Sequence, residues 1–190
     1  MDEINRIWPK WNTGRLIGRG SFGSVYEVSR NDLGHEVKAA VKILHIPQAA
    51  IEIDDLRSTG MSDTDIQRYY EGISHSLLEE IRIMVSLKTA NNVVSIEDYE
   101  IIPHEDGIGW SIYIRMELLE SLSEVLRRGV LPVHEAVQLG IDLCGALRNC
   151  ESAHIIHRDI KPDNIFRTQF ATYKLGDFGI ARQMEQTRGN

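Results

Sequence analysis

This sequence of 190 residues has few cysteines and no long apolar run. Its two cysteines, Cys144 and Cys150, are too few for a zinc site. They are six positions apart in a segment expected to be helical, so they do not face one another on adjacent turns, and we predict two reduced core thiols. No apolar run reaches the ~18 residues of a membrane span, and the acidic start Met1-Asp2-Glu3 is unlike a signal peptide. These absences lead us to expect a soluble, cytoplasmic protein without a membrane span.

Basic residues are also in deficit. Lysine and arginine number 21 against 28 aspartate and glutamate, which gives a net charge of −7. Surfaces that bind nucleic acid carry an excess of Lys and Arg, so we expect no nucleic-acid partner. An apolar fraction of 42% with 26% charged residues is typical of a soluble globular chain, and this length is sufficient for a proper core.

Strands are predicted first along the chain, because β-branched and aromatic runs alternate with turn residues from Trp11 to Leu44. Asn31-Asp32-Leu33-Gly34 is typical of a hairpin turn, and Pro47 ends the strand that follows. Two further strands are expected around Val93–Ile102 and Trp110–Met116.

Helices are predicted where the apolar period changes. Ser62 and Asp65 resemble a capping box, and apolar residues then recur at steps of three and four. That first face consists of Ile66, Tyr70, Ile73, Leu77, Ile81 and Met84. A second helix begins near Pro132, a favourable first-turn residue. Its apolar side consists of Val133, Val137, Ile141, Cys144 and Leu147. Strands first and helices later indicate an α+β fold.

A glycine-rich segment, Gly18-Arg-Gly20-Ser-Phe-Gly23-Ser-Val25, is the first motif with chemical content. Glycine lets the backbone approach phosphate oxygens and offer N–H groups without interference from a Cβ atom. A dinucleotide-binding turn opens a helix, whereas Val25, Tyr26 and Val28 indicate that these glycines join two strands. An ordinary glycine-rich hairpin is the alternative.

Lys42 lies inside the apolar strand Ala40-Val41-Lys42-Ile43. A buried lysine is costly unless it is paired, and Glu80 on the first helix is its expected partner. Glu79 is the rival to Glu80. The alternative is that Lys42 lies at a strand edge, where its ammonium group reaches water and needs no partner.

A third cluster lies near the end of the chain. The run His157-Arg158-Asp159-Ile160-Lys161-Pro162-Asp163-Asn164 is followed, thirteen residues after Asn164, by Asp177-Phe178-Gly179. In this order, after a glycine-rich loop and a strand lysine, the motifs resemble those of the eukaryotic-type Ser/Thr protein kinase family. The matching motifs run from Gly18 to Gly179.

The resemblance implies an ATP-dependent transferase that uses Mg²⁺. Lys42 would hold the α- and β-phosphates and be oriented by Glu80. Asp159 would accept the proton of the substrate hydroxyl, and Lys161, which in this family marks the Ser/Thr type, would steady the γ-phosphate. Asn164 and Asp177 are the implied Mg²⁺ ligands, with the oxygen donors that this ion prefers.

The resemblance also implies a nucleotide site. Met116 would be the gatekeeper, Glu117 and Leu119 would offer backbone groups to adenine, and the purine would lie among Val25, Ala40 and Phe166, for which core packing is the alternative. The implied ATP-binding residues are Gly18, Gly20, Ser21, Phe22, Gly23, Val25, Ala40, Lys42, Met116, Glu117, Leu119 and Phe166. A stacked apolar spine would consist of Met84, Ile96, His157 and Phe178.

The implied fold is an antiparallel five-stranded N-lobe with a long helix, plus an incomplete, mainly helical C-lobe. We expect residues 1–119 to form the N-lobe and hinge, and 120–190 part of the C-lobe. Lys42 and Glu80 are 38 positions apart, more than this family usually needs, so residues 46–75 would be an insertion or a helix extension, similar to insertions of bacterial members.

Only eleven residues follow Gly179, so the resemblance extends to only part of the second lobe. The apolar side of the helix that begins near Pro132 would then be bare, and we expect self-association or dependence on a partner. Phosphorylation of Ser/Thr in protein substrates is the leading hypothesis. The alternatives are an ATP-binding or regulatory module without efficient transfer, and a small-molecule kinase of related fold.

Overall fold

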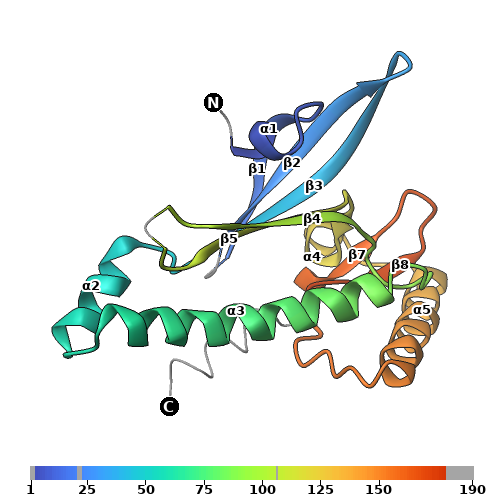
Figure 1. Ribbon diagram of the computed structural model, residues 1–190. Helices are drawn as coiled ribbons and strands as arrows, with labels where there is room; N and C mark the ends of the chain where they lie inside the picture. The colour runs from blue at the N-terminus through green and yellow to red at the C-terminus, as the bar shows by residue number, and fades with distance from the viewer. Residues whose placement is uncertain (1–2, 21–22, 106, 179–190) are drawn as a thin grey trace. The chain divides into compact units, whose positions relative to one another are not determined.

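The structure, a computed structural model, describes residues 3–20, 23–105 and 107–178 (Figure 1). The chain forms two compact units. Unit 1 consists of the described residues up to Leu78 together with Glu97–Leu118. Unit 2 consists of Glu79–Ile96 together with the described residues from Leu119 onward.

A five-stranded sheet forms the centre of unit 1, and its strand order is β1-β2-β3-β5-β4 (Figure 1). The pairs β1–β2, β2–β3 and β3–β5 are antiparallel. The strands are β1 (Asn12–Gly20), β2 (Gly23–Asp32), β3 (His35–Ile46), β4 (Ile96–Pro103) and β5 (Trp110–Glu117). The predicted hairpin joins β2 to β3, with Leu33 and Gly34 at φ of 50° and 87° and the Gly34 N–H donating to Asn31 Oδ1 at 3.0 Å. The five-stranded sheet that the resemblance implied is therefore confirmed.

One face of this sheet is covered by the start of the chain, a feature that the sequence analysis did not predict. The short helix α1 (Glu3–Ile7) leads into Trp8 and Trp11, which are buried in a cluster with alternate residues of β3. The Arg115 guanidinium lies 4.9 Å and 4.8 Å from the centres of the two indole rings. Trp8 Nε1 also donates to Asp98 Oδ2 at 2.8 Å. The side chains that β3 directs away from this cluster lie on the opposite face.

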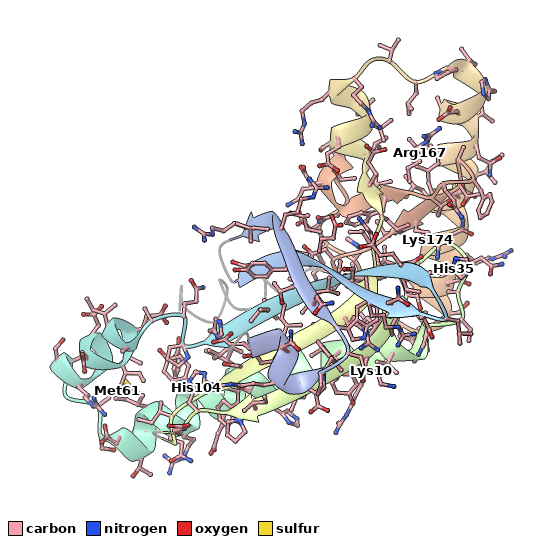
Figure 2. All side chains as sticks on the ribbon, turned by 90° about the horizontal axis from the view of Figure 1, so that it is seen from above. Lys10, His35, Met61, His104, Arg167 and Lys174 are labelled. Atoms are coloured by element: carbon pink, nitrogen blue, oxygen red, sulfur yellow. The ribbon has the colours of Figure 1, made fainter. Side chains whose placement is uncertain are left out.

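Two helices follow β3. Helix α2 (Ala50–Ser58) and the 24-residue helix α3 (Asp63–Ser86) are joined by the turn that contains Met61 (Figure 2). Half of the predicted capping box is present, because Asp65 N–H donates to Ser62 Oγ at 3.2 Å. The Asp65 carboxylate accepts from the Ser62 hydroxyl, at 2.6 Å, and not from the Ser62 backbone. All six residues of the predicted apolar face are buried: Ile66, Tyr70, Ile73, Leu77, Ile81 and Met84. Of residues 46–75, Ile46 ends β3, and most of the others form α2 and the first half of α3.

Unit 2 combines a small sheet with helices. The strands β6 (Glu120–Ser121), β7 (Ile165–Arg167) and β8 (Tyr173–Leu175) pair in the order β6-β7-β8. Arg167 and Lys174 lie on its two neighbouring strands, β7 and β8 (Figure 2). The helices are α4 (Leu122–Arg127), α5 (Val133–Ser152) and the 3-10 turn η1 (Pro162–Asn164). A capping box between Ser121 and Glu124 starts α4.

Helix α5 buries one side and exposes its predicted apolar side. Asp142 and Cys150 are buried, whereas Val133 is 82% exposed and Ile141 is 59% exposed. The prediction of two core thiols is wrong for Cys144, which is exposed, and right for Cys150; both cysteines are free. The reason is helical geometry: Asp142 and Cys150 are eight residues apart and share a face, while Cys144 is two residues from Asp142 and points elsewhere. No helix among the described residues is both long and apolar enough to cross a membrane.

Candidate functional site

Strand register gathers several predicted nucleotide-binding residues on one face of the unit 1 sheet. Directly opposite residues of antiparallel strands share a face, and Val25 of β2 is opposite Lys42 of β3. Ala40 of β3 is likewise opposite Met116 of β5. Since Ala40 and Lys42 are two residues apart, all four lie on one face. Lys42 is half-buried there, on the face opposite the tryptophan cluster.

The predicted glycine-rich segment joins β1 to β2, as expected for a strand–strand turn. Gly18 and Gly20 end β1, Gly23 begins β2, and Gly20 pairs with Gly23. Ser21 and Phe22 lie outside the described residues. A Cβ atom on Gly23 would lie 1.9 Å from the carbonyl oxygen of Ile43, so only glycine fits where β2 crosses so close to β3.

The predicted partner of Lys42 stays a prediction. Glu79 and Glu80 both lie within α3, but their side chains are outside the part of the chain that the structure describes in detail. Lys42 does make an interaction in the structure, so it is not a free cation. The choice between the two glutamates therefore remains open.

Three predicted catalytic and metal-binding residues of unit 2 are in direct contact. Lys161 Nζ donates to Asp159 Oδ2 at 2.8 Å. Asn164 Nδ2 donates to the same Oδ2 at 3.0 Å and to the backbone oxygen of Asp159 at 2.8 Å. Hydrogen bonding to the Asp159 carboxylate raises the pKa of the Lys161 ammonium group. The side chain of Asp159 is thus held from two directions, while Asn164 itself is buried.

His157 links this loop to the segment around Phe178. Its ring is 3% exposed and lies 4.8 Å from the ring of Phe178, between centroids. Nε2 lies 2.9 Å from the Gly176 carbonyl oxygen, and the backbone N–H of Asp159 donates to Nδ1 at 3.3 Å. The two contacts require a neutral ring with its proton on Nε2, and burial lowers the pKa of His157 accordingly. Met84 and Ile96, the other predicted spine residues, are also buried.

The predicted Mg²⁺ ligands, Asn164 and Asp177, supply an amide and a carboxylate. Both hydrogen bonds of the Asn164 amide nitrogen go to Asp159, which leaves Oδ1 as the atom that Asn164 can offer a cation. Asp177 has φ of 54°. Among the described residues, no group of three or more His, Cys, Asp or Glu side chains could hold a metal ion. This pair suits Mg²⁺, which usually takes one or two protein ligands and completes its shell with phosphate oxygens and water.

The remaining predicted adenine contacts are divided between the units. Glu117 ends β5 in unit 1, and Leu119 immediately precedes β6 in unit 2. Phe166 of β7 pairs with Ser121 of β6 and packs so closely on Gly176 that a Cβ atom there would be 3.0 Å from its ring. Asp142 is a further buried polar residue of unit 2 that was not predicted. No signal in the sequence marked its side of α5 as buried, because the apolar side predicted for this helix is another one.

Known proteins of one family are similar to this chain. The family model described as "Protein kinase domain" matches residues 11–189. The chain is 31% identical over 166 residues to "Serine/threonine-protein kinase PknK" of Mycobacterium tuberculosis, a match that covers 87% of this chain and 13% of that protein. It is 31% identical over 179 residues to "Serine/threonine-protein kinase PknA" of the same species, covering 93% of this chain and 36% of that protein. It is 27% identical over 180 residues to "Serine/threonine-protein kinase GIN4" of Saccharomyces cerevisiae, covering 93% and 14%. The chain thus spans a minor part of the length of these relatives, and it belongs to the protein kinase family.

Proposed function

We propose that this chain transfers the γ-phosphoryl group of ATP to serine or threonine hydroxyls of protein substrates. The observation that carries the proposal is the fixed carboxylate of Asp159, held at Oδ2 by Lys161 and Asn164. Phosphoryl transfer depends on positioning and charge neutralisation more than on covalent chemistry by the protein. A carboxylate fixed beside a lysine and an asparagine amide supplies both.

Each residue then has a distinct task. Asp159 orients the substrate hydroxyl and accepts its proton, while Lys161 and Asn164 hold its carboxylate at Oδ2. Lys161 keeps its positive charge, because the pKa of its ammonium group is raised, and it neutralises negative charge near the transferred group. Lys42, oriented by Glu80, is proposed to hold the α- and β-phosphates from the sheet face that also carries Val25 and Ala40.

The protein kinase family generally uses ATP with Mg²⁺, and the residues present suit both. ATP·Mg²⁺, when bound, supplies the phosphoryl group and neutralises its charge. Asn164 and Asp177 would hold the metal ion, and the glycine-rich segment from Gly18 to Gly23 would enclose the phosphates. The sheet face with Val25, Ala40 and Met116 would contact the adenine, and the family resemblance implies Glu117, Leu119 and Phe166 as further adenine contacts. Residues 1–119 and 120–190 would correspond to an N-lobe with hinge and a partial C-lobe.

The test combines binding and transfer. ATP is titrated with and without Mg²⁺, and incorporation of labelled phosphate into a generic protein and a Ser/Thr peptide library is measured for the wild type and for Asp159→Asn. We expect Mg²⁺-dependent ATP binding in both proteins, and phosphotransfer only in the wild type, with a loss of several orders of magnitude in the variant. Transfer that is equal in the two proteins overturns the role of Asp159.

A second function is favoured by the exposed side of α5. Val133, Val137 and Ile141 are 82%, 58% and 59% exposed, and apolar patches of this kind usually belong to an interface. A chain that binds ATP·Mg²⁺, but transfers phosphate only when another protein surface packs on this face, would act as an ATP-binding or regulatory module. If the wild-type chain binds ATP·Mg²⁺ without transferring phosphate, this second function is favoured. Light scattering measures the oligomeric state and so shows whether a second copy of the chain packs on this face.

A further inference from the structure

A buried carboxylate in unit 2 takes no part in the candidate site described above. Asp142 of α5 is 7% exposed and accepts three hydrogen bonds. The donors are Gln138 Nε2 at 3.0 Å and Asn92 Nδ2 at 3.0 Å, both to Oδ1, and the backbone N–H of Tyr173 at 2.8 Å to Oδ2. All three are neutral. Within the described residues no lysine, arginine or histidine forms a salt bridge with Asp142.

The donors explain why this position holds a carboxylate. Burying a carboxylate without a cation is costly, so an apolar or neutral residue would be preferred if α5 only had to pack here. An ionised carboxylate offers acceptor sites alone, and both of its oxygens face N–H groups. An amide in the same place would turn its own NH₂ group toward at least one of these donors. The site therefore requires an acceptor at both oxygens.

Asp142 joins two segments that are distant in sequence. Asn92 follows α3, and its Nδ2 also donates to the Tyr173 carbonyl oxygen at 3.2 Å. The backbone N–H of Leu175 donates to the Asn92 carbonyl oxygen at 2.8 Å, and Val94 N–H donates to Leu175 oxygen at 2.9 Å. The segment from Asn92 to Val94 thus runs beside β8, and the Asp142 carboxylate fastens both of them to α5.

Strand β8 leads directly to the predicted metal ligand. It has three residues and ends at Leu175, two positions before Asp177. Between them, Gly176 N–H donates to the Asn164 carbonyl oxygen at 2.9 Å. A Cβ atom on Gly176 would lie 2.6 Å from Val94 Cγ2, so only glycine fits where this segment passes Val94. A displacement of β8 therefore reaches Asp177 within two residues.

We propose that Asp142 is a positioning residue that, through Asn92 and Tyr173, fixes β8 and thereby the place of Asp177. This inference rests on the proposed function, in which Asp177 binds Mg²⁺. Residues that orient a metal ligand typically change metal affinity or activity 10–100-fold when they are altered. Asp142 acts through a strand rather than on the ligand itself, so we expect an effect of about tenfold, the lower end of that range.

The first test is Asp142→Asn, which keeps the shape of the side chain and removes one acceptor. The Mg²⁺ concentration that half-saturates binding of a fluorescent ATP analogue should rise about tenfold, and the amides of Tyr173 and Leu175 should exchange hydrogen faster. The matched control is Tyr173→Phe, which removes the 3.0 Å bond from the Tyr173 hydroxyl to Glu135 on the same helix and keeps the backbone N–H. The control should keep the wild-type Mg²⁺ requirement. A wild-type Mg²⁺ requirement and wild-type exchange in Asp142→Asn overturn the proposal.

A second pair of variants separates positioning from stability. Gly145 and Gly140 both lie in α5, where alanine favours the helix. A Cβ atom on Gly145 would lie 2.8 Å from Asn92 Oδ1, whereas one on Gly140 meets nothing within 4 Å. Gly145→Ala should displace the Asn92 amide and raise the half-saturating Mg²⁺ concentration, while Gly140→Ala should leave it unchanged. Equal Mg²⁺ requirements in the two variants contradict the proposal.

The exchange measurement keeps the two proposals distinguishable. A wild-type chain that binds no ATP·Mg²⁺ overturns the proposed function, and with it the metal-positioning role of Asp142. Exchange at the Tyr173 amide still decides whether Asp142 holds β8. Protection that is lost in Asp142→Asn and kept in Tyr173→Phe supports that contact, and equal protection in both contradicts it.

Discussion

The two units hold their candidate residues by different physical means. In unit 1, Val25, Ala40 and Lys42 take their places from the register of β2 and β3, so backbone hydrogen bonds of the sheet do the positioning. In unit 2, Asp159 and Asn164 sit in a loop and are held by side-chain hydrogen bonds to one another.

The backbone differs as well. Arg158 and Asp177 of unit 2 have φ of 64° and 54°, the left-handed region that costs a non-glycine residue roughly 1 kcal/mol or more. The described strand residues of the unit 1 face have no positive φ. A site built on strands should therefore tolerate the loss of a single side chain, whereas a site built on a loop should depend on each contact.

The largest expected effect is in the loop. Asn164→Ala removes both hydrogen bonds to Asp159 and, by our proposal, a Mg²⁺ ligand, so we expect phosphotransfer to fall at least about a hundredfold. We also expect the free energy of unfolding of unit 2 to fall by about 1–3 kcal/mol, because two part-buried hydrogen bonds to Asp159 are lost and each contributes about 1 kcal/mol. Transfer assays and urea denaturation measure the two effects.

The matched variant is Asn164→Asp, which keeps the size of the side chain and places a second carboxylate against Asp159. It should lose as much activity as Asn164→Ala, since repulsion replaces the hydrogen bond at Oδ2. Wild-type transfer in either variant would show that the loop does not depend on this contact, and the contrast between the units would disappear.

The same contrast explains what could be predicted from the sequence. The apolar period of α3 and the turn residues at Asn31–Gly34 determine local structure directly, and both predictions are confirmed. Strand alternation also predicts which face Lys42 shares with Ala40. The loop around Asp159 has no period, and it was recognised only because its residues resemble a family motif.

Features that depend on distant partners were missed or wrong. The packing of Trp8 and Trp11 on the sheet depends on Arg115 and Asp98, about ninety or more positions away from them, and no local pattern indicates it. Cys144 was predicted to be a core thiol, but it lies on the exposed apolar side of α5. The structure instead buries the side of α5 that carries Asp142, since that side contacts Asn92 and Tyr173.

Gly23→Ala tests the candidate residues of unit 1, which are positioned by strands. Its Cβ atom would lie 1.9 Å from the Ile43 carbonyl oxygen, so β2 and β3 must separate, and we expect the free energy of unfolding to fall by about 1–3 kcal/mol. Gly18→Ala is the control in the same segment, because its Cβ atom would make an ordinary 3.7 Å contact with Val25. Urea denaturation should show a loss for Gly23→Ala only. Equal stabilities would mean that the register at Gly23 is easily adjusted.

Alkaline pH should destabilise both units through one tyrosine each. Burial raises the pKa of Tyr113 in unit 1, with help from Glu3, and burial raises the pKa of Tyr173 in unit 2, with help from Glu135. The unfolded chain therefore loses these protons first, near the ordinary tyrosine value of about 10, while the folded chain keeps them. The free energy of unfolding should fall as pH rises past about 10, because the folded state then binds more protons.

Denaturation between about pH 8 and 11 measures this slope. Tyr113→Phe and Tyr173→Phe should each flatten it by removing one titrating group. A slope that neither variant changes would assign the alkaline loss to other groups, and a change in one variant alone would identify the unit that unfolds first.

The smallest effect concerns thiol reactivity and reports on unit 2 alone, because Cys144 and Cys150 both lie there. Cys144 is exposed, whereas Cys150 is buried and burial raises the pKa of its thiol, so its reactive thiolate is both scarcer and less accessible. Alkylation at neutral pH should modify Cys144 quickly and Cys150 only as fast as unit 2 opens. The variant Cys144→Ala isolates the slow thiol, Cys150.

If ATP·Mg²⁺ binds to residues of unit 2, it should slow the alkylation of Cys150 further, since a ligand of the folded state reduces opening. An unchanged rate at saturating ATP·Mg²⁺ would place all binding energy in unit 1, which would leave the loop around Asp159 without a part in nucleotide binding.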